Sequence, residues 1–220
     1  MKSKEKDLAQ SHFDFEYSDS DNDSAPEYGD EAYWEDRYKS CKESYDWYFE
    51  WKYISPHIDK YLNRSGKSLV IGCGNSTMSF EMASDKFEDI YSIDISPTVI
   101  EQMKETYKDY PQLKWEVMDC ANLKYDDNTF QSVFDKGTID AILCKEDLKL
   151  QVSNVLKEVY RVLQMNGRFY SITFGSPSNR LAFLKLEKLN WYLYPPLSLR
   201  YVNNSLSSSK AYVYIFEKKK

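Results

Sequence analysis

Glycines and carboxylates at the ends of apolar runs are the residues of this chain whose types and spacing could do chemistry. The apolar run 68–71 leads directly into Gly72 and Gly74, where a missing side chain lets backbone approach a ligand closely. About twenty residues later the apolar run 90–95 carries Asp94 near its end. A glycine turn after one strand and a carboxylate after the next are typical of a parallel sheet that binds a nucleoside. In such a site the carboxylate binds the ribose hydroxyls.

Asp119 and Cys120 follow a third apolar run, residues 113–118, and would join the other strand ends at one edge of the sheet. Asp119 offers an acceptor for an adenine amino group, with the backbone N–H of Cys120 beside it. A dinucleotide site would need a third glycine where Thr77 stands. Because that glycine is absent, the pattern favours a nucleoside that carries an amino acid, which is S-adenosylmethionine. The free N–H groups of a helix expected at 77–83 are predicted to face it.

The elements that must position these residues alternate along the chain. Strands are expected at 68–71, 90–95, 113–118, 129–135, 168–173, 191–194 and 211–216. Helices are expected at 54–61, 77–83, 97–107 and 148–163. The alternation predicts an α/β fold: a doubly wound, mainly parallel, seven-stranded sheet with helices on both faces.

Aromatic residues are concentrated between Tyr33 and Tyr53, where nine of twenty-one positions are Trp, Tyr or Phe. Trp34 and Tyr38 are four residues apart and would lie on one face of a helix. The segment could pack on the sheet or cover the ligand of the glycine turn, and one helix could do both.

The negative charge of the chain is concentrated near its N-terminus. The net charge is −6, residues 1–31 carry −7 and the remainder carries +1, so no broad basic surface for duplex nucleic acid is expected. Residues 1–27 are expected to be an acidic, disordered tail, and residues 28–220 one domain. The scattered cysteines and histidines leave no zinc-ligand spacing. Without a signal peptide or membrane-spanning run, a soluble, reduced, cytoplasmic protein is predicted.

Several short motifs together resemble class I S-adenosylmethionine-dependent methyltransferases, and within them the branch that methylates lysine in translation elongation factor 1-alpha. These motifs are VIGCGNS at 70–76, SIDIS at 92–96, VMDC at 117–120 and FDKGTIDA at 134–141, with YWEDRY at 33–38 and YDWY at 45–48 resembling that branch's N-terminal segment. The resemblance covers roughly residues 28–173. It implies a Rossmann-like methyltransferase fold, with S-adenosylmethionine as cofactor and S-adenosylhomocysteine as product.

The resemblance also implies which residues hold the cofactor. The aromatic segment would close over it, Gly72 would contact its methionine moiety and Asp94 its ribose. Ile95 would lie against the adenine ring, the residues after the third strand would bind the adenine edge, and Lys136 would line the methionine end. The expected cofactor-binding residues are Trp34, Tyr38, Trp47, Gly72, Gly74, Asp94, Ile95, Asp119, Cys120 and Lys136.

Methyl transfer to lysine needs no protein nucleophile, because the amine attacks the methyl carbon of the sulfonium directly and the thioether leaves. The proton lost by the lysine could pass to water through Asp135, Asp140 or a tyrosine, and the sequence does not choose among them. The leading hypothesis is a protein-lysine methyltransferase that acts on elongation factor 1-alpha as a monomer, without nucleic acid or membrane partners. Two alternatives stay open: a methyltransferase for a small molecule or another protein, and a non-catalytic cofactor-binding module that docks a partner through its acidic tail.

Overall fold

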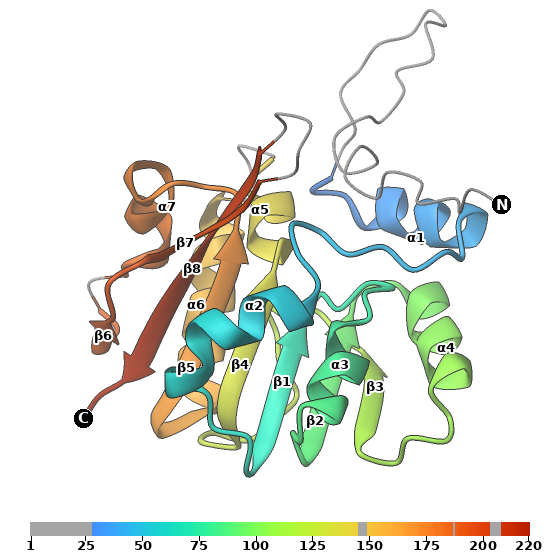
Figure 1. Ribbon diagram of the computed structural model, residues 1–220, viewed down its shortest axis with the longest axis horizontal. Coiled ribbons are helices and arrows are strands. Elements are labelled where there is room, and N and C mark those ends of the chain that lie inside the picture. The colour runs from blue at the N-terminus through green and yellow to red at the C-terminus, as the bar shows by residue number, and fades with distance from the viewer. Residues whose placement is uncertain (1–27, 145–148, 187, 203–207) are drawn as a thin grey trace, which may run out of the picture.

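Helices and strands alternate along most of the chain, as Figure 1 shows. The computed structural model describes residues 28–144, 149–186, 188–202 and 208–220, so the expected acidic tail at 1–27 lies outside the described residues. The helices are α1 (Glu31–Ser40), α2 (Trp51–Ile58), the short 3₁₀ helix η1 (Asp59–Tyr61), α3 (Met78–Ser84), α4 (Pro97–Thr106), α5 (Thr138–Ile142), α6 (Lys149–Val162) and α7 (Pro177–Leu184). The strands are β1 (Lys67–Ile71), β2 (Asp89–Asp94), β3 (Leu113–Val117), β4 (Phe130–Lys136), β5 (Leu163–Thr173), β6 (Trp191–Leu193), β7 (Leu197–Val202) and β8 (Ser208–Lys218).

The strands of the described chain form one sheet in the order β3-β2-β1-β4-β5-β8-β6, with β7 also paired to β8. The first five strands pair in parallel, whereas β8 runs antiparallel to β5, β6 and β7. The predicted doubly wound, mainly parallel α/β fold is therefore confirmed. The sheet has eight strands, however, and not the expected seven, because β7 pairs with the first half of β8. The alternation of Leu197 and Leu199 with polar residues is a strand pattern.

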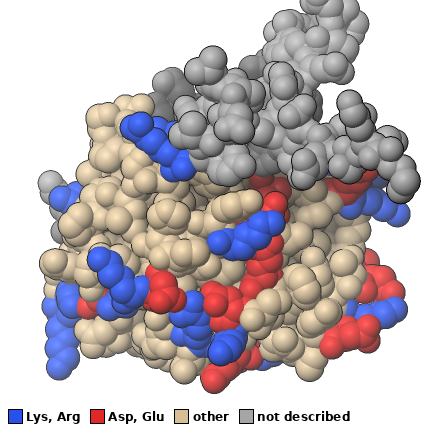
Figure 2. Space-filling model, viewed as in Figure 1, with Lys and Arg blue, Asp and Glu red and all other residues tan. Residues whose placement is uncertain are grey.

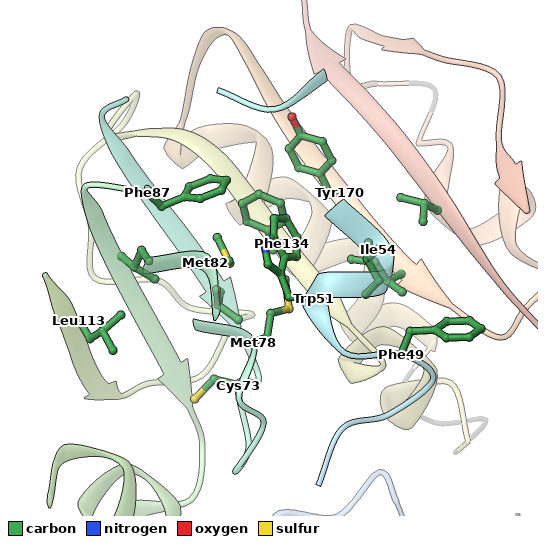
Figure 3. Packing of buried hydrophobic residues seen from close by; sticks show 14 of the residues in the cluster. Phe49, Trp51, Ile54, Cys73, Met78, Met82, Phe87, Leu113, Phe134 and Tyr170 are labelled. Carbon is green, nitrogen blue, oxygen red and sulfur yellow. The ribbon is translucent and has the colours of Figure 1, made fainter. Parts of the chain in front are cut away.

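Each face of the sheet is covered by its own helices and carries its own hydrophobic core. Val70 belongs to the core under α2, α3 and α4, whereas its neighbours Leu69 and Ile71 belong to the core under α5 and α6. This alternation follows from the two-residue period of a strand that is buried on both faces. Figure 3 shows Trp51 of α2 beside Phe134 in the first core, and the two ring centroids lie 5.6 Å apart. Trp51 thus fixes the point at which the aromatic region joins the sheet.

The aromatic region forms two helices, although a single helix was considered from the sequence. α1 ends at Ser40, residues 41–50 are non-helical, and α2 begins at Trp51. α1 lies beyond the edge of the sheet toward which β1 and β5 point (Figure 1). The two readings of this region therefore apply to different parts of it: α2 packs on the sheet, whereas α1 lies over the carboxyl edge.

Charged side chains of both signs are interspersed on the described part of the face shown in Figure 2. This arrangement gives that face no broad basic area of the kind that binds a phosphate backbone. Within the described ranges, none of the helices has the length and apolar character that a membrane crossing requires.

Candidate active site

One cavity lies at the carboxyl edge of the sheet, and all ten residues expected from the sequence line it. Its volume is about 270 Å³, close to the lower end of the range of about 300–1,000 Å³ that is usual for small-molecule sites. The strand ends supply the floor of the cavity, and residues of α1 and the 41–50 segment supply its outer wall. The ten residues are Trp34, Tyr38, Trp47, Gly72, Gly74, Asp94, Ile95, Asp119, Cys120 and Lys136.

The turn after β1 requires glycine at two positions. Gly72 and Gly74 have φ angles of +57° and +51°, in the left-handed region that favours glycine. A Cβ atom at Gly72 would lie 2.1 Å from Oγ1 of Thr138, and one at Gly74 would lie 2.7 Å from the hydroxyl of Tyr38. The turn is therefore packed between α1 and the first residue of α5, and no side chain fits there.

Asp94, the last residue of β2, holds this turn in place. Its Oδ2 accepts a hydrogen bond from the backbone N–H of Gly74 at 2.9 Å, and its Oδ1 accepts one from Ser96 at 3.0 Å. Burial raises the pKa of Asp94, and these backbone donors oppose the increase. The carboxylate thus joins the ends of β1 and β2 and presents an acceptor at the cavity floor.

The residues after β3 form the neighbouring wall of the cavity. Asp119 Oδ1 accepts a hydrogen bond from the backbone N–H of Ala121 at 2.8 Å, which fixes the orientation of the carboxylate. Cys120 is buried, and burial raises the pKa of its thiol well above its ordinary value. Cys120 is therefore a packing residue with no nucleophilic character.

The N-terminus of α3 adjoins the cavity, which Ser76 and Met78 line, but the carboxylate of Asp46 already accepts from the N–H group of Thr77 there. Asp46 Oδ2 accepts hydrogen bonds from the backbone N–H of Thr77 at 3.2 Å and from its hydroxyl at 2.9 Å. The hydroxyl of Ser76 donates to Oδ1 of the same carboxylate. A carboxylate from the 41–50 segment thus satisfies the helix N-terminus that a ligand was expected to use.

Asp46 also forms a buried ion pair with Lys136 at the end of β4. The Nζ–Oδ1 distance is 2.5 Å, and the side chains of Lys136 and Asp46 are only 4% and 9% exposed. Burial alone would raise the pKa of Asp46. The ammonium of Lys136 and the hydrogen bonds to the carboxylate lower this pKa by more than burial raises it, so the net shift is downward. Burial lowers the pKa of Lys136, and Asp46 opposes that shift. The pair ties the outer wall of the cavity to the strand beneath it.

A second carboxylate fastens α1 to the N-terminus of α4. Glu35 Oε2 accepts from the hydroxyl of Ser96 at 2.5 Å, and the Glu35 carboxylate also accepts from the backbone N–H and the hydroxyl of Thr98. Gln102 of α4 donates to the carbonyl oxygen of Tyr38 at 2.8 Å. These contacts hold α1 so that the Trp34 and Tyr38 rings stack above the cavity, with centroids 6.0 Å apart. We call residues 31–50 the lid segment.

The lid segment should loosen in acid. Hydrogen bonds from Ser96 and Thr98 lower the pKa of Glu35 to about 2, from an ordinary value of 4.5. The stabilisation is therefore complete above about pH 4.5 and is lost as the pH falls toward 2. Hydrogen exchange of the α1 amides, corrected for the intrinsic rate at each pH, should rise over that range. Glu35→Gln should raise the hydrogen exchange of the α1 amides already at pH 7, whereas Glu105→Gln on the exposed face of α4 should not. Equal exchange in the two variants would contradict this role.

The two aspartates considered for proton transfer lie in different surroundings. Asp140 lines the cavity, whereas Asp135 is fully buried behind it and accepts hydrogen bonds from Ser171 Oγ at 2.7 Å and from two backbone N–H groups of α5. Burial raises the pKa of Asp135 to about 7. Asp135 therefore caps α5, and of these two aspartates only Asp140 lines the cavity.

Sequence reasoning missed several residues around the cavity. Arg37 lines it and lies three positions after Trp34, so helical spacing could have identified it. Tyr45 and Tyr48 belong to the motif at 45–48, which had been represented by Trp47 alone. Asp46 had no local signal, because its partners Ser76 and Lys136 lie 30 and 90 residues away.

Comparisons with known proteins show which family the chain resembles. The model of a family described as a methyltransferase domain matches residues 62–218. The chain is 34% identical over 177 residues to EEF1A lysine methyltransferase 4 of Mus musculus, covering 76% of this chain and 69% of that protein. It is 40% identical over 156 residues to the eEF1A lysine and N-terminal methyltransferase of Homo sapiens, covering 69% of this chain but only 22% of that protein.

Solved structures share the fold at low sequence identity. A SAM-dependent methyltransferase from Methanosarcina mazei superposes with a TM-score of 0.61 at 18% identity, covering 74% of this chain and 97% of that one. The N-methyltransferase NodS from Bradyrhizobium japonicum, solved with S-adenosyl-L-homocysteine, gives a TM-score of 0.59 at 11% identity, with coverages of 77% and 85%. The family match, the length over which the chain aligns with EEF1A lysine methyltransferase 4 and the shared fold lead to one conclusion: this chain belongs to the methyltransferase domain family.

Proposed function

We propose that this chain transfers a methyl group from S-adenosylmethionine to a lysine side chain of translation elongation factor 1-alpha. The observation that carries the proposal is that a glycine turn, two strand-end carboxylates and a layer of aromatic rings meet in one cavity. The extended similarity to EEF1A lysine methyltransferase 4 supports this choice of substrate. As part of the proposal, the chain acts as a cytoplasmic monomer without nucleic acid or membrane partners.

The chemistry of the cavity residues suits this cofactor. Asp94 would accept hydrogen bonds from the ribose hydroxyls and Asp119 from the adenine amino group. The backbone at Gly72 and Gly74 can contact the ligand closely because these residues have no side chains. Aromatic faces attract cations, so the rings of the lid segment would also favour a sulfonium. When bound, S-adenosylmethionine supplies an electrophilic methyl group, which passes from sulfur to an amine nitrogen in one displacement step.

The protein must favour the neutral form of its acceptor. A lysine side chain has an ordinary pKa of about 10.4, so roughly one in a thousand is neutral near pH 7.4. Trp34, Trp47 and Tyr48 surround the cavity with low-polarity surface, and burial against such rings disfavours an ammonium. Alignment of the amine with the methyl group can supply several kcal/mol, about 7–11 in the best cases.

A methylation assay tests the proposal. Purified protein, recombinant elongation factor 1-alpha and S-adenosylmethionine labelled in the methyl group should give a labelled factor, with the methyl group on lysine by mass spectrometry. Labelling of another extract component, with an unlabelled factor, would instead support the alternative that the chain methylates a small molecule or another protein. Cofactor binding without transfer to any extract component would support the binding module.

Asp94→Ala should weaken the binding of S-adenosylmethionine at least about tenfold by calorimetry, because the variant loses a charged acceptor and leaves the N–H groups of Gly74 and Ser96 without their partner. Asp89→Ala is the matched control, since Asp89 begins the same strand and pairs with Lys114 away from the cavity. Circular dichroism confirms that both variants fold. Unchanged affinity in a folded Asp94→Ala protein would rule out the proposed role of this carboxylate.

A further inference from the structure

The strand order fixes where an acceptor must enter. Asp119 follows β3, Asp94 ends β2, and the glycine turn follows β1, so these groups succeed one another along the edge of the sheet. Beyond them come the end of β4 at Lys136 and the end of β5 at Thr173. An adenosine held over β3 and β2 would direct the sulfur end of the cofactor toward β1 and β4. The acceptor would then approach over β4 and β5, on the side away from the adenosine.

A hydrogen-bonded cluster occupies that end of the cavity. The hydroxyl of Tyr48 donates to Asp140 Oδ2 at 2.5 Å, and both residues line the cavity. Asp140 also accepts from Thr173 Oγ1 at 2.5 Å and from the backbone N–H of Phe174 at 3.0 Å, and it pairs with Arg180 at 2.7 Å. Its side chain is 12% exposed. The cluster joins the lid segment, α5, β5 and α7, so Asp140 has little freedom to move.

The Tyr48 ring is held in one orientation. Its φ angle of +66° is unusual for a residue other than glycine and shows that the surrounding structure imposes it. The ring lies over Gly137, where an added Cβ atom would be 3.5 Å from Tyr48 Cε2. Gly137 follows Lys136 directly, so the ring stands above the carboxyl end of β4.

The hydroxyl of Tyr48 can act toward a ligand in only one way. Its single proton is donated to Asp140, and a phenol has no second N–H or O–H to give. Burial and the Asp140 carboxylate raise the pKa of Tyr48 far above its ordinary value, so the phenol stays protonated. The backbone N–H of Phe174 also faces this oxygen, and what the oxygen still offers to a ligand is its remaining lone pair. A group that approaches it must therefore be a hydrogen-bond donor, such as the N–H of an amine.

We propose that Tyr48 is a catalytic residue that accepts an N–H hydrogen bond from the acceptor amine, and that Asp140 is a positioning residue that holds its hydroxyl. The inference rests on the proposed methyl transfer and concerns the same cavity. One N–H of the neutral amine is bound by Tyr48, which turns the nitrogen lone pair toward the methyl carbon. The N–C bond forms as the C–S bond breaks, sulfur keeps the electron pair of that bond, and the extra proton on nitrogen passes to water.

Tyr48→Phe tests the inference, because it removes the hydroxyl and keeps the ring. With both substrates saturating, kcat on unmodified elongation factor 1-alpha should fall about 10- to 100-fold, the range for a hydrogen bond to a group that develops charge. The dissociation constant for S-adenosylhomocysteine should change by less than about twofold, because the contact is with the amine. Tyr107→Phe removes a hydroxyl from an aromatic stack outside the cavity and should leave kcat unchanged.

Asp140→Asn separates positioning from mere packing. In the wild-type background it should lower kcat, whereas in the Tyr48→Phe background it should have little further effect, because Asp140 acts through the hydroxyl that is already absent. Additive losses in kcat, or losses confined to KM and to cofactor affinity, would overturn the inference. A wild-type protein that methylates nothing would refute the proposed function, whereas an active wild type with undiminished kcat in Tyr48→Phe would refute this inference alone.

Discussion

Replacing Lys136 with methionine should lower the free energy of unfolding by about 3–5 kcal/mol, the usual effect of removing one partner of a buried ion pair. The Asp46 side chain is only 9% exposed, and the variant removes the cation that pairs with its carboxylate. Thermal unfolding followed by circular dichroism measures the effect. For a chain of this length the midpoint should fall by roughly 10 °C.

Two further variants show that burial of the charge is the cause. Adding Asp46→Asn to Lys136→Met should recover part of the loss, since no uncompensated charge is then buried. Lys114→Met breaks the ion pair with Asp89, in which the side chain of Lys114 is 42% exposed and that of Asp89 is 26% exposed. This variant should lower the free energy of unfolding by less than about 1 kcal/mol. Equal losses in Lys136→Met and Lys114→Met would mean that the Asp46 pair contributes no more than a surface contact.

Gly72→Ala should weaken the binding of S-adenosylmethionine by about a hundredfold or more. The new Cβ atom would lie 2.1 Å from Thr138 Oγ1, and the alanine residue would have to adopt a φ of +57°. Either the turn or Thr138 must then move, and strain of roughly 1–3 kcal/mol adds to the displaced contacts. Calorimetry with the purified variant measures the affinity, and each 1.4 kcal/mol of lost binding free energy corresponds to about tenfold.

The steric and backbone parts of this effect can be separated. Gly66 has a φ of +82°, but a Cβ there would make only an ordinary contact, 3.7 Å from Gln131. Gly66→Ala therefore carries the backbone strain without the clash and should leave cofactor affinity unchanged. Thr138→Ala combined with Gly72→Ala should restore part of the affinity. If Gly72→Ala binds as tightly as Gly66→Ala, the close packing of the turn is not required for binding.

The fold and the strand-end residues of the cavity could be predicted because their signals are local, whereas Trp34, Tyr38 and Trp47 were expected from the resemblance of the N-terminal motifs. Each strand end carries its functional residue within a few positions, as Asp94 does in β2, and a parallel sheet brings all such ends to one edge. The distance between the motifs in sequence therefore did not matter. The helix starting at Pro97 was equally clear, because Ser96 caps it and proline suits its first turn.

The contacts that close the cavity could not be predicted, because they join segments far apart in sequence. Asp46 and Lys136 are 90 residues apart, and Tyr48 and Asp140 are 92 apart. From local sequence alone, an acidic residue within an aromatic stretch is expected to be exposed to solvent. Its partners depend on how residues 41–50 cross the glycine turn, and no periodic pattern specifies that path. For the same reason the helix N-terminus of α3 was assigned to a ligand when Asp46 already occupied it.

The attachment of the lid segment by Glu35 and Asp46 has a kinetic consequence. Both carboxylates rest on helix N-termini of the sheet domain, so the segment can swing away only when these attachments break together with those of Tyr38 to Gln102 and Tyr48 to Asp140. The residence time of a molecule beneath it is then governed by that rare opening. In an enzyme built this way, departure of the spent cofactor would limit the maximal rate, so turnover would respond to substitutions at the attachments of the lid segment, away from the reacting atoms.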